Sequence, residues 1–173
     1  MKVLFLGDIV GRSGREALNK HLHKINLDNE IDFTIVNGEN AAGGFGITEK
    51  ICGELYNAGA NAITTGNHLW DQKEISKYIE KDNRLLKPYN SAEGTPGVGF
   101  NTFKTENDEK IIVINLIGNV FMKTNDNPFS KIDELMNKLK NENDVKFIFV
   151  DFHAEATSEK VAMGHHLNGR VTA

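Results

Sequence analysis

Apolar and polar positions change their spacing several times along the chain, and each change predicts the start of a strand or a helix. Near-continuous apolar runs predict strands over Lys2–Leu6, Ile31–Val36, Ala60–Thr64, Ile111–Leu116 and Lys146–Val150. Between these runs, apolar residues recur every three or four positions, which is typical of helices that cover a sheet. The alternation predicts an α/β fold, with helices on both faces of a layered, largely parallel sheet.

Short polar signals predict where the helices begin and end. The residues expected to cap helix N-termini are Ser13, Thr48, Asp71 and Ser130. Thr157 or Ser158 is expected to begin the last helix, and Gly59 to end the second. Residues 170–173 have the pattern of a further strand that starts at the end of the sequence.

The pattern is lost between Leu85 and Phe100, where prolines and glycines crowd together. This composition predicts a long loop over residues 85–100. The loop could close over a site as a lid, or it could be a plain surface connection, and the pattern does not separate the two.

Composition limits the class of protein. The chain has 173 residues, of which 39% are hydrophobic, so we expect one domain that spans residues 1–173. The net charge of -4 argues against a broad basic face for duplex DNA or for a membrane surface. No apolar run approaches the roughly 20 residues of a membrane span. Cys52 is the only cysteine, which excludes an internal disulfide and fits a cytoplasmic protein.

Residues that can bind a metal follow directly after several predicted strands. They are Asp8, Glu39, Asn40, Asn67, His68 and His153. In open α/β sheets the carboxyl ends of the strands line the ligand crevice, so we expect these side chains to converge. The alternative is that they only cap helices and form turns, in an α/β scaffold without a metal.

No lysine or arginine stands at these strand ends to neutralise the carboxylates, so we expect a bound cation to do so. Carboxylate, amide and imidazole ligands together suit Mn, Fe or Zn better than Mg or Ca. Glu39 can bridge two ions, and paired metals about 3.5–4 Å apart are common in phosphoester hydrolysis. Gly43, Gly44 and Gly46 would let the backbone approach a ligand without obstruction.

Ordered segments from one end of the chain to the other resemble the YmdB-like bacterial metallophosphoesterases of the calcineurin-like superfamily. These segments are Gly7–Gly11, Asn37–Ala42, Thr65–Asp71, Glu93–Gly97 and Asp151–Lys160. The resemblance implies a calcineurin-like metallophosphoesterase fold with two divalent or mixed-valence metal ions, Fe or Mn before Zn. It also implies hydrolysis of small phosphodiesters, with 2',3'- or 3',5'-cyclic nucleotides as substrates.

The resemblance also implies a role for each residue of the site. Asp8 resembles a ligand of the first metal, and Glu39 the bridge between both metals. Asn40, Asn67 and His153 resemble ligands of the second metal. His68 resembles the residue that donates a proton to the leaving oxygen. The expected partner is a small phosphodiester; an RNA-related substrate and a homo-oligomer are left open.

Members of this family continue beyond the position of Ala173 into a Gly-x-His-x-His strand end, which adds one imidazole to each metal. The resemblance therefore implies a C-terminally incomplete domain. His165 and His166 are adjacent and would point about 100° apart on a helix, so we do not expect them to replace those ligands. If the protein ends at Ala173, the alternative function is a non-catalytic nucleotide- or metal-binding regulatory module.

Overall fold

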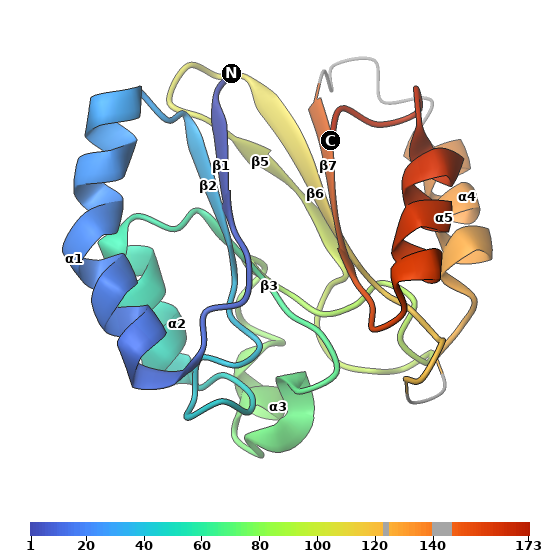
Figure 1. The fold of residues 1–173 in the computed structure, drawn as a ribbon, viewed down its shortest axis with the longest axis horizontal. Coiled ribbons are helices and arrows are strands. Elements are labelled where there is room, and N and C mark those ends of the chain that lie inside the picture. The colour runs from blue at the N-terminus through green and yellow to red at the C-terminus, as the bar shows by residue number, and fades with distance from the viewer. Residues whose placement is uncertain (123–124, 140–146) are drawn as a thin grey trace.

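The computed structural model describes residues 1–122, 125–139 and 147–173, which form two sheets flanked by helices (Figure 1). The first sheet is parallel and contains, in spatial order, β1 (Val3–Leu6), β2 (Phe33–Asn37), β3 (Ala62–Thr64) and β4 (Leu85–Leu86). In the second sheet, β6 (Lys110–Ile117) pairs antiparallel with β5 (Phe100–Lys104) and parallel with β7 (Phe147–His153). Lys146, the first residue of one predicted strand, lies outside the described residues.

Helices cover the outer face of each sheet. In Figure 1, α1 (Gly11–Asn29) and α2 (Glu49–Ala58) lie beside the first sheet, and α4 (Pro128–Leu139) and α5 (Thr157–Leu167) lie beside the second. A short 3₁₀ helix, η1 (Leu69–Asp71), and α3 (Ile75–Tyr78) follow β3. The predicted layered α/β fold with helices on both faces is confirmed, although the strands are divided between two sheets. Among the described residues, no helix combines the length and apolar character needed to cross a membrane.

Three buried clusters hold these layers together, one at each junction between them. In β2, Val36 packs toward α1 and α2, whereas Ile35 packs toward the second sheet. In β6, Ile112 packs toward α4 and α5, whereas Val113 packs toward the first sheet. Because these strands bury both faces, their sequences are near-continuous apolar runs rather than alternating ones.

The predicted loop over residues 85–100 is wrong at both ends, because Leu85–Leu86 is β4 and Phe100 begins β5. The two residues of β4 are too few to show a period, and only the first residue of β5 falls within the predicted loop. Between these strands, the Lys87 N–H donates to the Val98 carbonyl at 3.0 Å and the Tyr89 N–H to the Asn115 carbonyl at 2.7 Å. The segment therefore joins the two sheets, and its role as a lid stays a prediction.

The predicted helix ends are partly right. Thr48 caps α2, since its hydroxyl accepts from the Ile51 N–H at 3.3 Å, and Gly59 ends α2 with a φ of 117°. α5 begins at Thr157 as predicted.

Two of the expected N-caps are wrong for a local reason. Ser13 lies inside α1, because the helix already begins at Gly11 with Val10 before it. Asn127, not Ser130, receives the first amides of α4: its Oδ1 accepts from the Phe129 N–H at 2.9 Å and the Ser130 N–H at 3.3 Å.

The last residues of the chain run beside β7. The Thr172 N–H donates to the Ile148 carbonyl, and the Val150 N–H donates to the Ala173 carbonyl, each at 2.9 Å. This main-chain pairing agrees with the strand-like pattern of residues 170–173, although the segment is not a full strand.

Candidate metal centre

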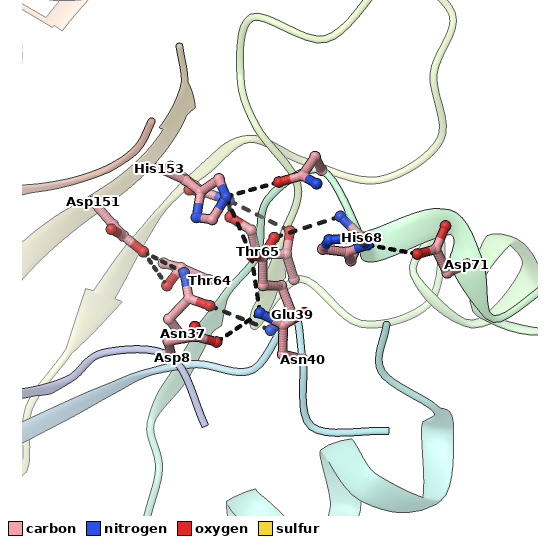
Figure 2. Close-up of polar contacts among 12 residues, drawn as sticks. Asp8, Asn37, Glu39, Asn40, Thr64, Thr65, His68, Asp71, Asp151 and His153 are labelled. Atoms are coloured by element: carbon pink, nitrogen blue, oxygen red, sulfur yellow. Dashed lines mark hydrogen bonds and ion pairs between the residues drawn. The ribbon is translucent and has the colours of Figure 1, made fainter. Parts of the chain in front are cut away.

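The carboxyl ends of β1, β2, β3 and β7 meet at one edge of the molecule, which Figure 2 shows in close-up. Each of these strands gives way to a loop at that edge, and His153 is the last residue of β7. Parallel strands place their carboxyl ends on one side, so residues far apart in the sequence are brought together there.

A continuous chain of polar contacts joins the residues predicted to bind metal. The Asn40 Nδ2 group donates to Asp8 Oδ1 at 2.8 Å and to Glu39 Oε1 at 3.3 Å. His153 Nε2 lies 3.1 Å from Glu39 Oε1 and 2.8 Å from Asn67 Oδ1. The structure therefore brings Asp8, Glu39, Asn40, Asn67 and His153 into one cluster, as the strand ends led us to expect. Figure 2 shows Asp8, Glu39, Asn40 and His153 lying together.

Glu39 is the most deeply buried member of this cluster, with 1% of its surface exposed. Burial raises the pKa of its carboxyl group, and the charge of His153 opposes this shift. Among the described residues, no lysine or arginine forms an ion pair with Glu39 or Asp8. A buried carboxylate in such surroundings is stabilised by a cation.

The Asn40 side chain gives a separate indication of a ligand. Its Oδ1 is buried and has no hydrogen-bond partner, although its Nδ2 makes two bonds. An unpaired buried oxygen costs about 1–3 kcal/mol, and a metal ion would satisfy it. No three histidine, cysteine, aspartate or glutamate side chains in the described ranges are grouped to hold an ion. A metal here would therefore depend on the asparagine oxygens, and the mixed donor set fits Mn, Fe or Zn.

Gly66 is required by the closeness of this packing. A Cβ atom at this position would overlap Glu39 Oε2 and would lie 2.6 Å from His153 Cδ2. Only glycine lets the β3 end pass so close to the Glu39 and His153 side chains.

The Asp8 backbone is in the sparsely populated left-handed region, with a φ of 36°. The loop that follows is bound to the β2 loop, because the Ile9 N–H donates to the Asn37 carbonyl and the Gly11 N–H to the Asn40 carbonyl, each at 2.9 Å. These bonds hold Asp8 beside Asn40.

His68 lies at the rim of the cluster. Its backbone N–H is 3.5 Å from Glu39 Oε2, while its ring Nδ1 is 2.6 Å from Asp71 Oδ2 (Figure 2). The prediction that Asp71 caps a helix is wrong, because its carboxylate binds the His68 ring instead and α3 has no side-chain cap. A carboxylate on Nδ1 fixes the tautomer and the orientation of an imidazole.

A further, partly buried group behind the cluster was not predicted as part of the site. Asp151 Oδ2 accepts from the Thr64 hydroxyl at 2.6 Å and from Asn37 Nδ2 at 3.0 Å. Asn37 Oδ1 in turn accepts from the Glu39 N–H at 3.3 Å. Burial raises the pKa of Asp151, and the bonds from Thr64 and Asn37 oppose the shift. The available signal was the spacing of two between Asp151 and His153, which puts both on one face of β7.

A family model described as YmdB-like protein matches residues 4–173. The chain belongs to this family. One relative, the 2',3'-cyclic-nucleotide 2'-phosphodiesterase of Bacillus subtilis (strain 168), is 47% identical over 173 residues. The match covers 100% of this chain and 64% of the relative.

Two solved structures have the same YmdB-like fold. A hypothetical protein from Thermus thermophilus and a novel phosphatase from Mycoplasma pneumoniae each match with a TM-score of 0.90, at 37% and 36% identity. Each match covers 99% of this chain, and 65% and 62% of the two proteins. The predicted family and fold are therefore confirmed, and the chain spans less than two thirds of the length of these proteins.

Proposed function

We propose that the protein is a metal-dependent phosphodiesterase that hydrolyses cyclic nucleotides, 2',3' or 3',5', or related small phosphodiesters. The observation that carries the proposal is the contact chain from Asp8 to Asn67, with the buried Asn40 oxygen unpaired within it. The Bacillus relative, named as a 2',3'-cyclic-nucleotide 2'-phosphodiesterase, supports the substrate class.

In this proposal, Asp8, Glu39, Asn40, Asn67 and His153 would hold two ions, with Glu39 as a ligand shared by both and Fe or Mn preferred to Zn. When bound, such ions supply a Lewis-acidic centre for the oxygens of the substrate phosphate. Asn37, through its bond to the Glu39 N–H, keeps the bridging residue in place. Burial of Glu39 excludes water from its carboxylate, so a cation bound there would interact with it more strongly than in water.

His68 provides the proton in this mechanism. Asp71 Oδ2 accepts a hydrogen bond from the Nδ1–H group of the ring. In the imidazolium form, the proton on Nε2 is therefore the one that would pass to the leaving alkoxide oxygen of the ester, which leaves a neutral ring still bound to Asp71.

The setting of the reaction is part of the same proposal. A single buried cysteine, Cys52, fits a protein of the reducing cytoplasm. An RNA-related phosphodiester fits the same chemistry as a cyclic nucleotide, and a homo-oligomer is compatible with it.

The proposal is tested by removing metal with a chelator and restoring Mn²⁺ or Fe²⁺. We expect hydrolysis of 2',3'-cyclic AMP or 3',5'-cyclic AMP only after metal is restored, with elemental analysis reporting the bound ions. Glu39→Gln should lose both metal and turnover, because it removes the charge at the centre of the contact chain. Binding of metal and nucleotide without turnover would instead favour the regulatory module, and absence of metal binding would favour the scaffold without a site.

Replacing Asp71 by asparagine tests how His68 is positioned. We expect the kcat for a cyclic nucleotide to fall roughly tenfold to a hundredfold with little change in KM or metal content, because the ring loses a charged partner at 2.6 Å. Asp71 has 39% of its side chain exposed, so the thermal midpoint should change little. A parallel rise in KM, or a loss of metal, would assign Asp71 a purely structural role. Asp28→Asn, at an exposed position of α1, is the matched control.

A further inference from the structure

Phe45 is an exposed aromatic side chain beside the proposed proton donor. It has 59% of its surface exposed, and its ring packs against the His68 ring in a T-shaped arrangement, with centroids 5.1 Å apart. Other exposed phenylalanines in the described part of the chain are Phe5, which pairs with Phe149, and Phe121. Phe45 is thus an exposed ring in direct contact with a residue of the site.

The loop that carries Phe45 is held firmly by hydrogen bonds. Gln72 Nε2 donates to the Phe45 carbonyl at 2.8 Å, and the Ala42 N–H donates to the Gly46 carbonyl at 2.8 Å. Gly46 has a φ of 80°, and a Cβ there would lie 2.8 Å from Gln72 Cγ and 3.1 Å from the His68 carbonyl oxygen. The backbone therefore brings the ring to a defined position next to His68.

An apolar ring that is exposed to water yet held by its backbone is suited to stack on a flat ligand. Stacking on such a ring loses little conformational entropy, because the loop is already ordered. Every nucleobase has a π-face, so an aromatic side chain binds a base without requiring one sequence or one base. The contact with His68 puts this surface next to the position where the ester would be cleaved.

We infer that Phe45 forms the base-binding part of the substrate site, on which the nucleobase of a cyclic nucleotide stacks while its phosphate reaches the metal centre. The inference rests on the proposed function and deepens it, since it makes the substrate a nucleotide rather than any small phosphodiester. It also makes Phe45 a specificity-determining residue.

The experiment compares Phe45→Ala, Phe45→Leu and Phe45→Tyr in the metal-loaded protein. Each variant is assayed with 2',3'-cyclic AMP and with glycerol 1,2-cyclic phosphate, which has the cyclic ester but no base. Binding of adenosine 3'-monophosphate is measured by titration calorimetry. Leu27→Ala, at an apolar position of α1 that is 66% exposed, is the control for loss of surface apolar area.

We expect Phe45→Ala and Phe45→Leu to raise the KM for 2',3'-cyclic AMP, and to weaken binding of the monophosphate, about tenfold each. Phe45→Tyr should stay within about twofold of the original protein in both measurements, because it keeps the aromatic face. Hydrolysis of glycerol 1,2-cyclic phosphate should be unchanged in all three variants.

Other outcomes overturn the inference. If Phe45→Ala lowers the activity equally on both substrates and Phe45→Leu keeps the original activity, the ring acts only by packing on His68. Unchanged nucleotide binding in Phe45→Ala, or no binding of the monophosphate to the original protein, would also overturn it. If the monophosphate binds in a Phe45-dependent way but no ester is hydrolysed, the base-binding site stands and the proposed phosphodiesterase activity fails.

Discussion

Replacing His68 by alanine is expected to lower the kcat for 2',3'-cyclic AMP by roughly 10²–10⁴-fold while the metal content is unchanged. The ring of His68 contacts Asp71 and Phe45 and takes no part in the contact chain of the five proposed ligands. Its removal should therefore leave the cluster intact and eliminate only the delivery of a proton. Steady-state kinetics with elemental analysis of the same preparation measures both quantities.

The leaving group separates proton donation from other roles of His68. The leaving group of a 4-nitrophenyl phosphodiester is 4-nitrophenolate, which is stable without a proton. Hydrolysis of this ester by His68→Ala should therefore be far less affected than hydrolysis of the cyclic nucleotide. His21→Ala is the matched control, because His21 is an exposed residue of α1. An equal loss on both substrates would remove His68 from the proton-donor role, and a loss of metal would make it a ligand.

Much of the fold could be predicted because a parallel strand that is buried on both faces has a recognisable sequence pattern. β2 is buried at all five positions, and its sequence is largely apolar, interrupted only by Thr34 and the terminal Asn37, so it can be recognised without other information. The division into two sheets could not be predicted, because a strand that is buried on both faces has the same pattern in either sheet. The packing of one sheet on the other depends on residues such as Ile35 and Val113, which come together only in the folded protein.

The convergence of the proposed ligands could be predicted because topology decides it, whereas contacts for which side chains compete could not. The strand ends carrying Asp8, Glu39 and His153 converge because parallel strands share an edge. The spacing of Asp71 and Glu74 fits a helix cap. However, Asp71 also lies three residues from His68, and its carboxylate binds the His68 ring at 2.6 Å instead. Local spacing allows both arrangements, and only the tertiary structure selects one.

Asp151 shows a different limit of sequence analysis. Its carboxylate meets Thr64 and Asn37, which belong to the other sheet and lie 87 and 114 positions away in the sequence. An aspartate inside an apolar strand indicates a polar partner, but the identity of that partner depends on how the two sheets face each other. These bonds hold together the two sheets at the edge where the proposed ligands lie.

Replacing Gly66 by alanine is expected to eliminate metal binding and to reduce turnover by at least about 100-fold, while the overall fold persists. The added Cβ would overlap Glu39 Oε2 and lie 2.6 Å from His153 Cδ2, so the Glu39 carboxylate must move away from the imidazole. A displacement of about 1 Å in a catalytic group is enough for a loss of that size. Metal content and kcat are measured together, with circular dichroism to follow the fold.

The same substitution at Gly53 in α2 is the matched control, because a Cβ there meets nothing within 4 Å. Gly53→Ala should bind metal normally and gain up to about 1 kcal/mol of stability from the higher helix propensity of alanine. Gly66→Ala should instead lose about 1–3 kcal/mol through overpacking. Because Gly66 does not have a positive φ, the backbone itself accepts alanine, and the damage must come from the Glu39 and His153 side chains. Normal metal binding by Gly66→Ala would mean that these two side chains do not hold an ion in the positions proposed for them.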